Sequence, residues 1–113
     1  MPAPDGEDSH LTVDTEAVGE GRYVVHLDGE LDLAGAGRLD AQLEAIADPV
    51  RIVIDVDKVS FIDSGGLATL LAWRRRCSDR RVDFTLTPGT PAVRKIFEVT
   101  GLLDRLPSRG AQR

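Results

Sequence analysis

The sequence has little cysteine and no long apolar run. Its single cysteine, Cys77, cannot form an internal disulfide or a multi-cysteine metal site, so the fold depends on packing alone, as is usual in a reducing compartment. The apolar runs are too short to span a bilayer, and we therefore expect no membrane insertion. The 113 residues, 42% hydrophobic and 29% charged, have the size and balance of one globular domain.

Basic and aromatic residues are also scarce. The chain has 14 Lys and Arg against 19 Asp and Glu, a net charge of −5, and 4% aromatic residues. Tracking a phosphate backbone requires an excess of basic side chains, and base stacking requires aromatic rings. We therefore expect no nucleic-acid partner.

The two ends of the chain are polar. Residues 1–9 contain two prolines, a glycine and three acids, and they carry no Lys or Arg and no apolar segment of the kind found in export signals. We expect a flexible acidic tail over 1–9, a domain over 10–107, a flexible tail over 108–113 and a cytoplasmic location.

Hydrophobic periodicity predicts a β-hairpin followed by three helices that alternate with two strands. The hairpin contains Leu11, Val13 and the run Tyr23–Leu27. The first helix runs from about Ala34 to near Asp48 and Pro49, the next strand covers Val50–Val56, the second helix covers Leu67–Arg76, the last strand covers Val82–Leu86, and the third helix begins after Thr90 and ends at Gly101.

The resulting order of elements predicts an α/β fold. The run Val50–Val56 is almost continuously apolar and β-branched, which is typical of a central parallel strand with both faces covered. We expect a mixed sheet of about four strands, in which the first hairpin is antiparallel and the later strands are parallel through right-handed crossovers, with helices packed against the sheet.

The turn Asp63-Ser64-Gly65-Gly66 lies where the central strand passes into a helix, the position at which open α/β sheets usually place their sites. Unpaired N–H groups at a helix start favour anionic or hydroxyl groups there. Asp and Ser are also ordinary N-caps, so capping alone is an alternative reading. Two adjacent glycines indicate either a positive φ or close approach by another backbone segment.

Several spaced motifs resemble those of a STAS domain, the module of sulfate transporters and anti-sigma factor antagonists. The resemblance covers about residues 10–107, and as a freestanding domain the chain resembles a bacterial anti-sigma factor antagonist. The motifs are Gly29-Glu30-Leu31-Asp32, Val53-Ile54-Asp55-Val56, Val59–Leu67 and Thr100-Gly101-Leu102-Leu103-Asp104.

The resemblance implies a regulator that binds an anti-sigma factor, often one with a serine-kinase ATPase domain, and so releases a sigma factor. In the family the kinase phosphorylates a Ser or Thr in Asp-Ser-[Ser/Thr]-Gly-Leu. Asp63 matches the first residue of this motif, Ser64 precedes the acceptor, and Gly65 stands at the acceptor position without a hydroxyl. Ser64 is a weak alternative acceptor, because neighbouring residues at a helix start differ by ~100° in direction and phosphoryl transfer requires in-line geometry.

The same resemblance implies a partner-binding surface that includes Asp32 of the first motif. Two interpretations of its acidic residues stay open: they form an acidic rim, or each caps the helix that follows it. On the binding interpretation, a bulky residue at Gly66 weakens partner binding more than thermal stability. The surface consists of Asp32, Asp63, Ser64, Gly65, Gly66 and Leu67.

The remaining reactive side chains indicate no catalytic, cofactor or metal site. His10 and His26 are isolated, without metal-ligand spacing. Cys77 falls on an apolar helix stripe and is interpreted as buried filler, with redox sensing as the alternative. The arginines of Arg74–Arg76 and Arg80-Arg81 form either a basic contact patch or a solvated helix end.

Rival functions follow from the same residues. An unphosphorylated STAS scaffold in a lipid-transport ATPase or stress-signalling complex is the alternative to a partner switch. An enzyme is not expected, because the chain has no Walker loop, no Gly-x-Gly-x-x-Gly and no Ser/His/Asp set. A response-regulator receiver is not expected either, because a hairpin opens the chain where a receiver's first strand would end in paired acids.

Overall fold

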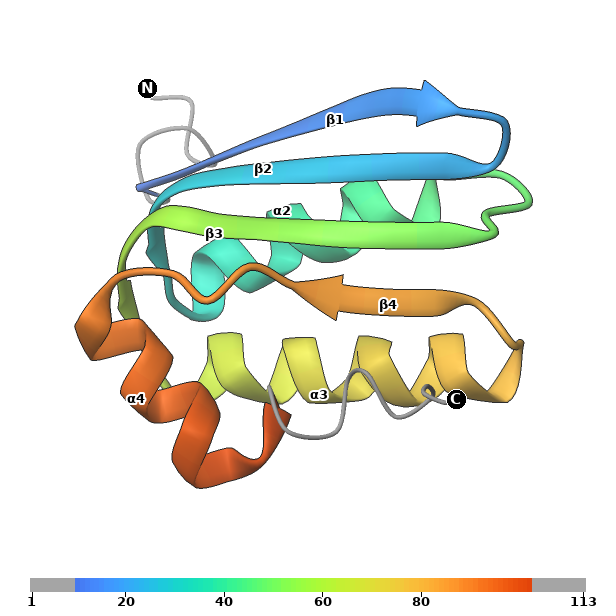
Figure 1. Ribbon diagram of the computed structural model, residues 1–113. Coiled ribbons are helices and arrows are strands. Elements are labelled where there is room, and N and C mark those ends of the chain that lie inside the picture. Colours follow the sequence, from blue (N-terminus) through green and yellow to red (C-terminus); the bar gives the residue numbers. More distant parts are fainter. Residues whose placement is uncertain (1–9, 103–113) are drawn as a thin grey trace, which may run out of the picture.

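The computed structural model describes residues 10–102, and the predicted tails, together with residues 103–107 of the predicted domain, lie outside this range. Within it, an initial hairpin is followed by helices and strands in alternation (Figure 1). The elements are β1 (Leu11–Gly19), β2 (Arg22–Leu31), α2 (Leu33–Glu44), β3 (Arg51–Ile62), α3 (Ser64–Asp79), β4 (Asp83–Leu86) and α4 (Pro91–Thr100).

The strands form one mixed sheet in the order β1-β2-β3-β4. β1 pairs with β2 in antiparallel orientation, whereas β2 with β3 and β3 with β4 are parallel. The predicted fold class is therefore confirmed. The caps predicted for α4 are also present, with Thr90 accepting a hydrogen bond from the N–H of Val93 and Gly101 adopting a φ of 78°.

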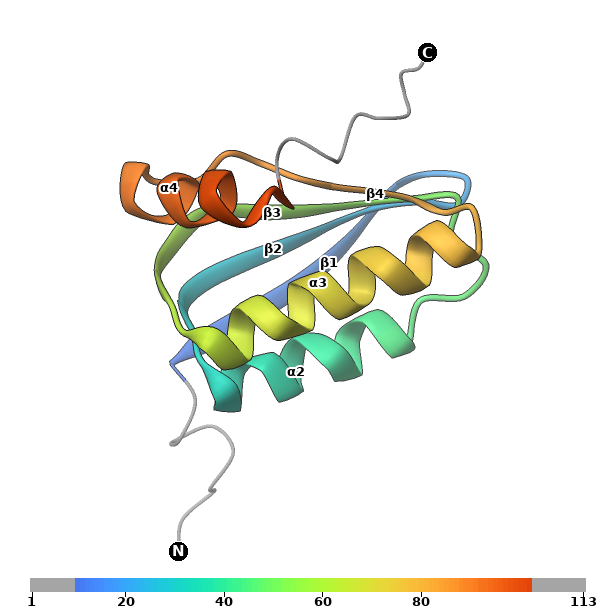
Figure 2. The same cartoon turned by 90° about the horizontal axis from the view of Figure 1, so that it is seen from below.

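Helices α2 and α3 lie side by side on one face of the sheet, and α4 is set apart from them, level with the sheet at its β4 edge (Figure 2). The apolar stripes of the paired helices supply Leu39, Leu43 and Leu70 to the core. The indole N–H of Trp73 on α3 donates to the carboxylate of Asp40 on α2, which joins the two helices at their surface. The core therefore fills the space between the sheet and this helix pair.

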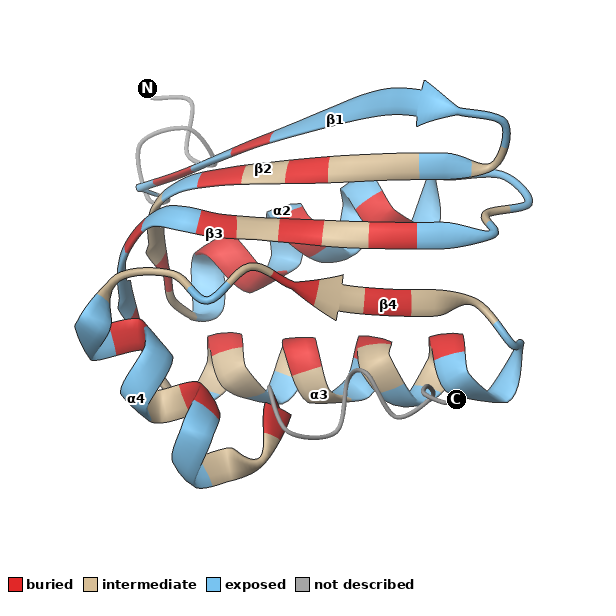
Figure 3. Cartoon of the chain, in the orientation of Figure 1, coloured by how far each residue is buried: buried red, intermediate tan, exposed pale blue. Residues whose placement is uncertain are grey.

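The expectation that both faces of the central strand are covered is wrong. Ile52, Ile54 and Val56 of β3 are buried and point into the core, but Arg51 is exposed and Asp55 is only partly buried, on the opposite face. Figure 3 shows the alternation of buried and less buried residues along β3. Residues of a strand point alternately to the two faces, so the polar residues in this run mark a face that no described helix covers. We call it the open face.

β3 is also longer than expected and continues to Ile62 rather than ending at Val56. Its register against β2 shifts twice, once between the pairs His26–Asp55 and Asp28–Lys58, and again after the pair Gly29–Val59. Such bulges change the face of the sheet to which the following side chains of the strand point. They let the polar residues at 57 and 58 stay exposed while Val59 and Ile62 turn into the core.

Two helix ends differ from the prediction. α2 ends at Glu44, with Ala45 as its C-cap, rather than near Asp48, although Ile46 still packs partly against the core. α3 continues to Asp79 and thereby places Cys77, which is 4% exposed, in the core as expected.

Candidate functional site

Two strand-to-helix junctions of the same design lie side by side at the carboxyl edge of the sheet. β2 and β3 are parallel neighbours, and their last residues, Leu31 and Ile62, are partners in the register. Each strand passes through one aspartate, Asp32 or Asp63, directly into a helix. The starts of α2 and α3 are therefore held next to each other by the sheet itself.

Both aspartates are N-caps. Asp32 Oδ1 accepts a hydrogen bond from the N–H of Gly35 at 2.8 Å, and Asp63 Oδ1 accepts one from the N–H of Gly66 at 2.9 Å. Of the two interpretations, capping is confirmed, and a cap of this kind stabilises a fold by about 1 kcal/mol. The carboxylates orient the first helical turns, with one oxygen of each engaged in the cap.

Gly66 lies beneath the turn rather than on its surface. It is buried, and a Cβ built on it would overlap the backbone carbonyl of Leu31 at the end of β2. Neither Gly65 nor Gly66 has a positive φ. Of the two reasons weighed for the glycine pair, close approach by another backbone segment is therefore the correct one for Gly66.

Gly65 is partly exposed and lies under the first residue of α2. A Cβ on Gly65 would be 3.2 Å from Leu33 Cδ1 and 3.3 Å from the Asp63 Oδ1 that forms the cap. These distances are tight but not overlapping, so a small side chain fits only if Leu33 moves by a few tenths of an ångström. Leu33 is itself 74% exposed.

The structure brings the other predicted site residues to the same edge. Ser64 is exposed as the first residue of α3, and Leu67 is partly buried against the core. Two residues missed by sequence reasoning join them: Leu33, and Phe61, which is 50% exposed just before the turn. Each of the two could have been recognised in the sequence as a large apolar residue at a position where the helix or strand pattern predicts a polar one.

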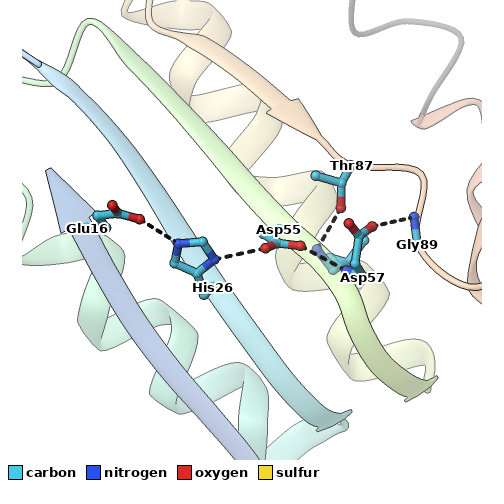
Figure 4. Close-up of polar contacts among 7 residues, drawn as sticks. Glu16, His26, Asp55, Asp57, Thr87 and Gly89 are labelled. Atoms are coloured by element: carbon cyan, nitrogen blue, oxygen red, sulfur yellow. Dashed lines mark hydrogen bonds and ion pairs between the residues drawn. The ribbon is translucent and has the colours of Figure 1, made fainter. Parts of the chain in front are cut away.

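A second group of polar residues lies away from this edge, on the open face of the sheet (Figure 4). His26 of β2, to which sequence reasoning assigned no site, lies between two carboxylates. Its Nδ1 is 2.8 Å from Asp55 Oδ2 on β3, and its Nε2 is 2.8 Å from Glu16 Oε1 on β1. The three residues come from three adjacent strands, so only the strand register brings them together.

The contacts of His26 with its neighbours shift the pKa values of His26 and Asp55. Hydrogen bonds to Glu16 and then to Asp55 raise the pKa of His26 above its ordinary value of 6.5. Burial by itself would raise the pKa of Asp55, but the N–H of Asp57 and the His26 ring together lower it. The imidazolium of His26 and the carboxylate of Asp55 thus stabilise each other's charged forms.

The arginines at the end of α3 are partly engaged in the fold. The Arg76 guanidinium lies 3.9 Å from the centroid of the Trp73 ring and 3.0 Å from Glu44 Oε2 on α2. Burial raises the pKa of the Cys77 thiol despite the nearby charges of Arg76 and Arg80. A raised pKa keeps this thiol protonated and unreactive, which favours the interpretation of Cys77 as apolar filler.

Between residues 10 and 102, no group of three or more His, Cys, Asp or Glu side chains is arranged to hold a metal ion. No helix in the described part of the chain is long and apolar enough to span a membrane.

Comparison with known proteins gives a consistent set of similarities. Residues 15–107 match the family described as Mlab, STAS domain. The chain is 30% identical over 90 residues to BtrV of Bordetella bronchiseptica, a protein provisionally named an anti-sigma factor antagonist, and the match covers 78% of each chain.

Solved structures agree with this match. An anti-sigma factor antagonist from Mycobacterium paratuberculosis is 29% identical with a TM-score of 0.70, over 95% of this chain and 88% of that one. The cell fate determinant SpoIIAA of Bacillus, in its phosphorylated form, is 25% identical with a TM-score of 0.67, over 80% of this chain and 85% of that one.

Proposed function

Because the chain belongs to the STAS domain family, we propose that it acts as an anti-sigma factor antagonist, which binds an anti-sigma factor and so frees a sigma factor. The names of the relatives from Bordetella bronchiseptica and Mycobacterium paratuberculosis support this function. The observation that carries it is the pair of capped junctions, which presents Ser64, Gly65 and Leu33 together at one edge of the sheet.

The proposed contact surface consists of the two junctions. Ser64 supplies an exposed hydroxyl and Leu33 an exposed apolar side chain, so a partner would bury Leu33 in an apolar pocket. One oxygen of Asp32 and one of Asp63 are taken by the caps, so these residues act mainly by fixing the shape of the surface. Gly66 and Leu67 support it from below.

We further propose that the partner is an anti-sigma factor of the serine-kinase ATPase type and that this chain is not switched at the family's acceptor position. SpoIIAA has a solved phosphorylated form, whereas the motif here has Gly65 at the acceptor position. Binding would then be constitutive, or controlled by protein abundance or by a ligand. The chain would act in the cytoplasm without catalytic activity of its own.

The test is a binding measurement with a matched pair of variants. Proteins that co-purify with the tagged chain are identified by mass spectrometry, and the anti-sigma factor among them is titrated calorimetrically against purified Leu33→Asp and Val99→Asp. Leu33 and Val99 are 74% and 75% exposed, but Val99 belongs to α4 and to neither junction. We expect Leu33→Asp to weaken binding at least tenfold and Val99→Asp to leave it unchanged.

Two results would count against this proposal. Recovery of no anti-sigma factor would contradict the function, and equal binding by both variants would contradict the surface. The alternative is a STAS scaffold subunit of a lipid-transport ATPase, which the family match over residues 15–107 fits equally. It predicts a transporter ATPase, rather than an anti-sigma factor, as the stoichiometric partner in the same purification.

A further inference from the structure

The open face carries a hydrogen-bonded group whose geometry depends on one proton. Both ring nitrogens of His26 lie 2.8 Å from carboxylate oxygens, one from Asp55 and one from Glu16. A carboxylate only accepts hydrogen bonds, and a neutral imidazole has a single N–H. The arrangement in the structure therefore requires the doubly protonated ring, because a neutral ring would direct a lone pair at one of the two carboxylates.

The two carboxylates are not held equally. Asp55 on the central strand is 28% exposed, and its Oδ1 accepts a hydrogen bond from the N–H of Asp57 at 3.0 Å. Glu16 is 60% exposed and belongs to β1, a strand at the edge of the sheet. When one bond must be given up, the flexible and more exposed Glu16 is the partner that can turn away to water.

We propose that His26 is a proton-dependent clamp on the edge strand β1: the protonated ring donates to both Asp55 and Glu16, and the ring that has lost a proton to solvent keeps Asp55 and releases Glu16. The clamp would hold the distal part of the β1–β2 hairpin to the sheet. The raised pKa of His26 brings this change toward neutral pH.

Other charged groups face the same region of the sheet, and their effect is included in the test. Asp14 is the direct register partner of His26 on β1 and places a further carboxyl group on the same face of the sheet. Asp28 of β2 and Lys58 of β3 follow on the same face, where they are register partners of each other. Residues 10–102 place no helix over this face (Figures 1 and 2).

The first experiment is a pH titration of the folded protein followed by ¹⁵N NMR of the histidine rings, with His26→Asn separating its signals from those of His10. The proposal predicts a midpoint above 6.5 and a neutral form that retains its proton on Nδ1, the nitrogen next to Asp55. A neutral ring protonated on Nε2 would overturn the proposal, because it would keep Glu16 and release Asp55.

The second experiment measures what the clamp holds. Hydrogen exchange of the amides at residues 15–18, corrected for the intrinsic effect of pH, should show protection about two- to fivefold lower above the His26 midpoint than below it, as expected for an exposed pair. The step should vanish in Glu16→Gln. Asp14→Asn removes the same charge from the same strand without removing a bond from the clamp, and should retain the step.

The two variants also separate a hydrogen bond from a general effect of charge. Glu16→Gln should lower the His26 midpoint further than Asp14→Asn does. Equal midpoints in the two variants, or protection of residues 15–18 that does not follow the His26 titration in the natural sequence, would refute the clamp.

Discussion

Replacing Gly66 by alanine tests the close approach between the two junctions. The added Cβ would overlap the carbonyl oxygen of Leu31, a backbone atom of β2 that cannot rotate away. Overpacking that displaces backbone costs about 1–3 kcal/mol, and a backbone obstacle favours the upper end of that range. Displacement of the first turn of α3 also weakens the Asp63 cap, worth about 1 kcal/mol.

Helix propensity works in the opposite direction, because alanine is favoured over glycine by about 1 kcal/mol within a helix. We therefore expect Gly66→Ala to lower the free energy of unfolding by about 3 kcal/mol, as a combination of these ranges. Gly37→Ala in α2 is the control, because no atom other than those of its chain neighbours and its own helix backbone lies within 4 Å of its Cβ position. It should raise the free energy of unfolding by about 0.5–1 kcal/mol.

Urea unfolding followed by the fluorescence of Trp73 provides the assay, since this single tryptophan is 4% exposed in the folded protein. An unfolding free energy for Gly66→Ala equal to that of Gly37→Ala would refute the steric argument. Because a bulky residue at Gly66 is expected to destabilise the fold, a loss of partner binding in such a variant would accompany a loss of folding. The variant therefore cannot test the contact surface by itself. Surface variants such as Leu33→Asp are therefore the better probes of the contact.

Three further predictions concern the same residues and the open face. Incubation with the anti-sigma factor kinase and ATP should leave the intact mass of the natural chain unchanged and should add one phosphate to Gly65→Ser. If the natural chain gains a phosphate and Ser64→Ala does not, Ser64 is the acceptor and the prediction is wrong. Asp32→Ala and Asp63→Ala should each lower the free energy of unfolding by about 1 kcal/mol in urea unfolding, and a loss below 0.3 kcal/mol would contradict the capping role. Because the pKa of folded His26 is raised above 6.5, the stability that comes from its protonation should be complete below that value and lost as pH rises through the folded-state pKa. The stability difference between the natural chain and His26→Gln should therefore shrink as pH rises, and a difference that grows with pH would contradict this sign.

The sequence was sufficient for the element order, because the apolar spacing in the hairpin and helices has a clear period. It was not sufficient for the second half of β3, because Asp57 and Lys58 indicate a turn unless bulges are present in the strand. The uncovered face could have been inferred from Arg51 and Asp55, two polar residues four positions apart and therefore on the same face of the strand. Local pattern therefore predicted elements better than it predicted their ends.

At the candidate site, the motif identified the turn around Asp63, and the glycine pair indicated a close approach. The partner in that approach, the carbonyl of Leu31, is 35 residues from Gly66 in the chain and is positioned only by the parallel pairing of β2 and β3. The sequence did not indicate the group of Glu16, His26 and Asp55 for the same reason, because its three members belong to three different strands. Contacts that depend on register require the assembled sheet.

Because Leu33 packs over Gly65, the residue at position 33 limits the size of the side chain that position 65 can accept. A side chain on the second residue of α3 would meet both the Cδ1 and the Cα of Leu33, at 3.2 and 3.3 Å, so enlarging position 65 requires both the side chain and the backbone of the first residue of α2 to shift. Acquisition of a hydroxyl at position 65 would thus favour a compensating smaller residue at position 33. Aligned relatives should accordingly show the two positions varying together, although 32 residues separate them along the sequence.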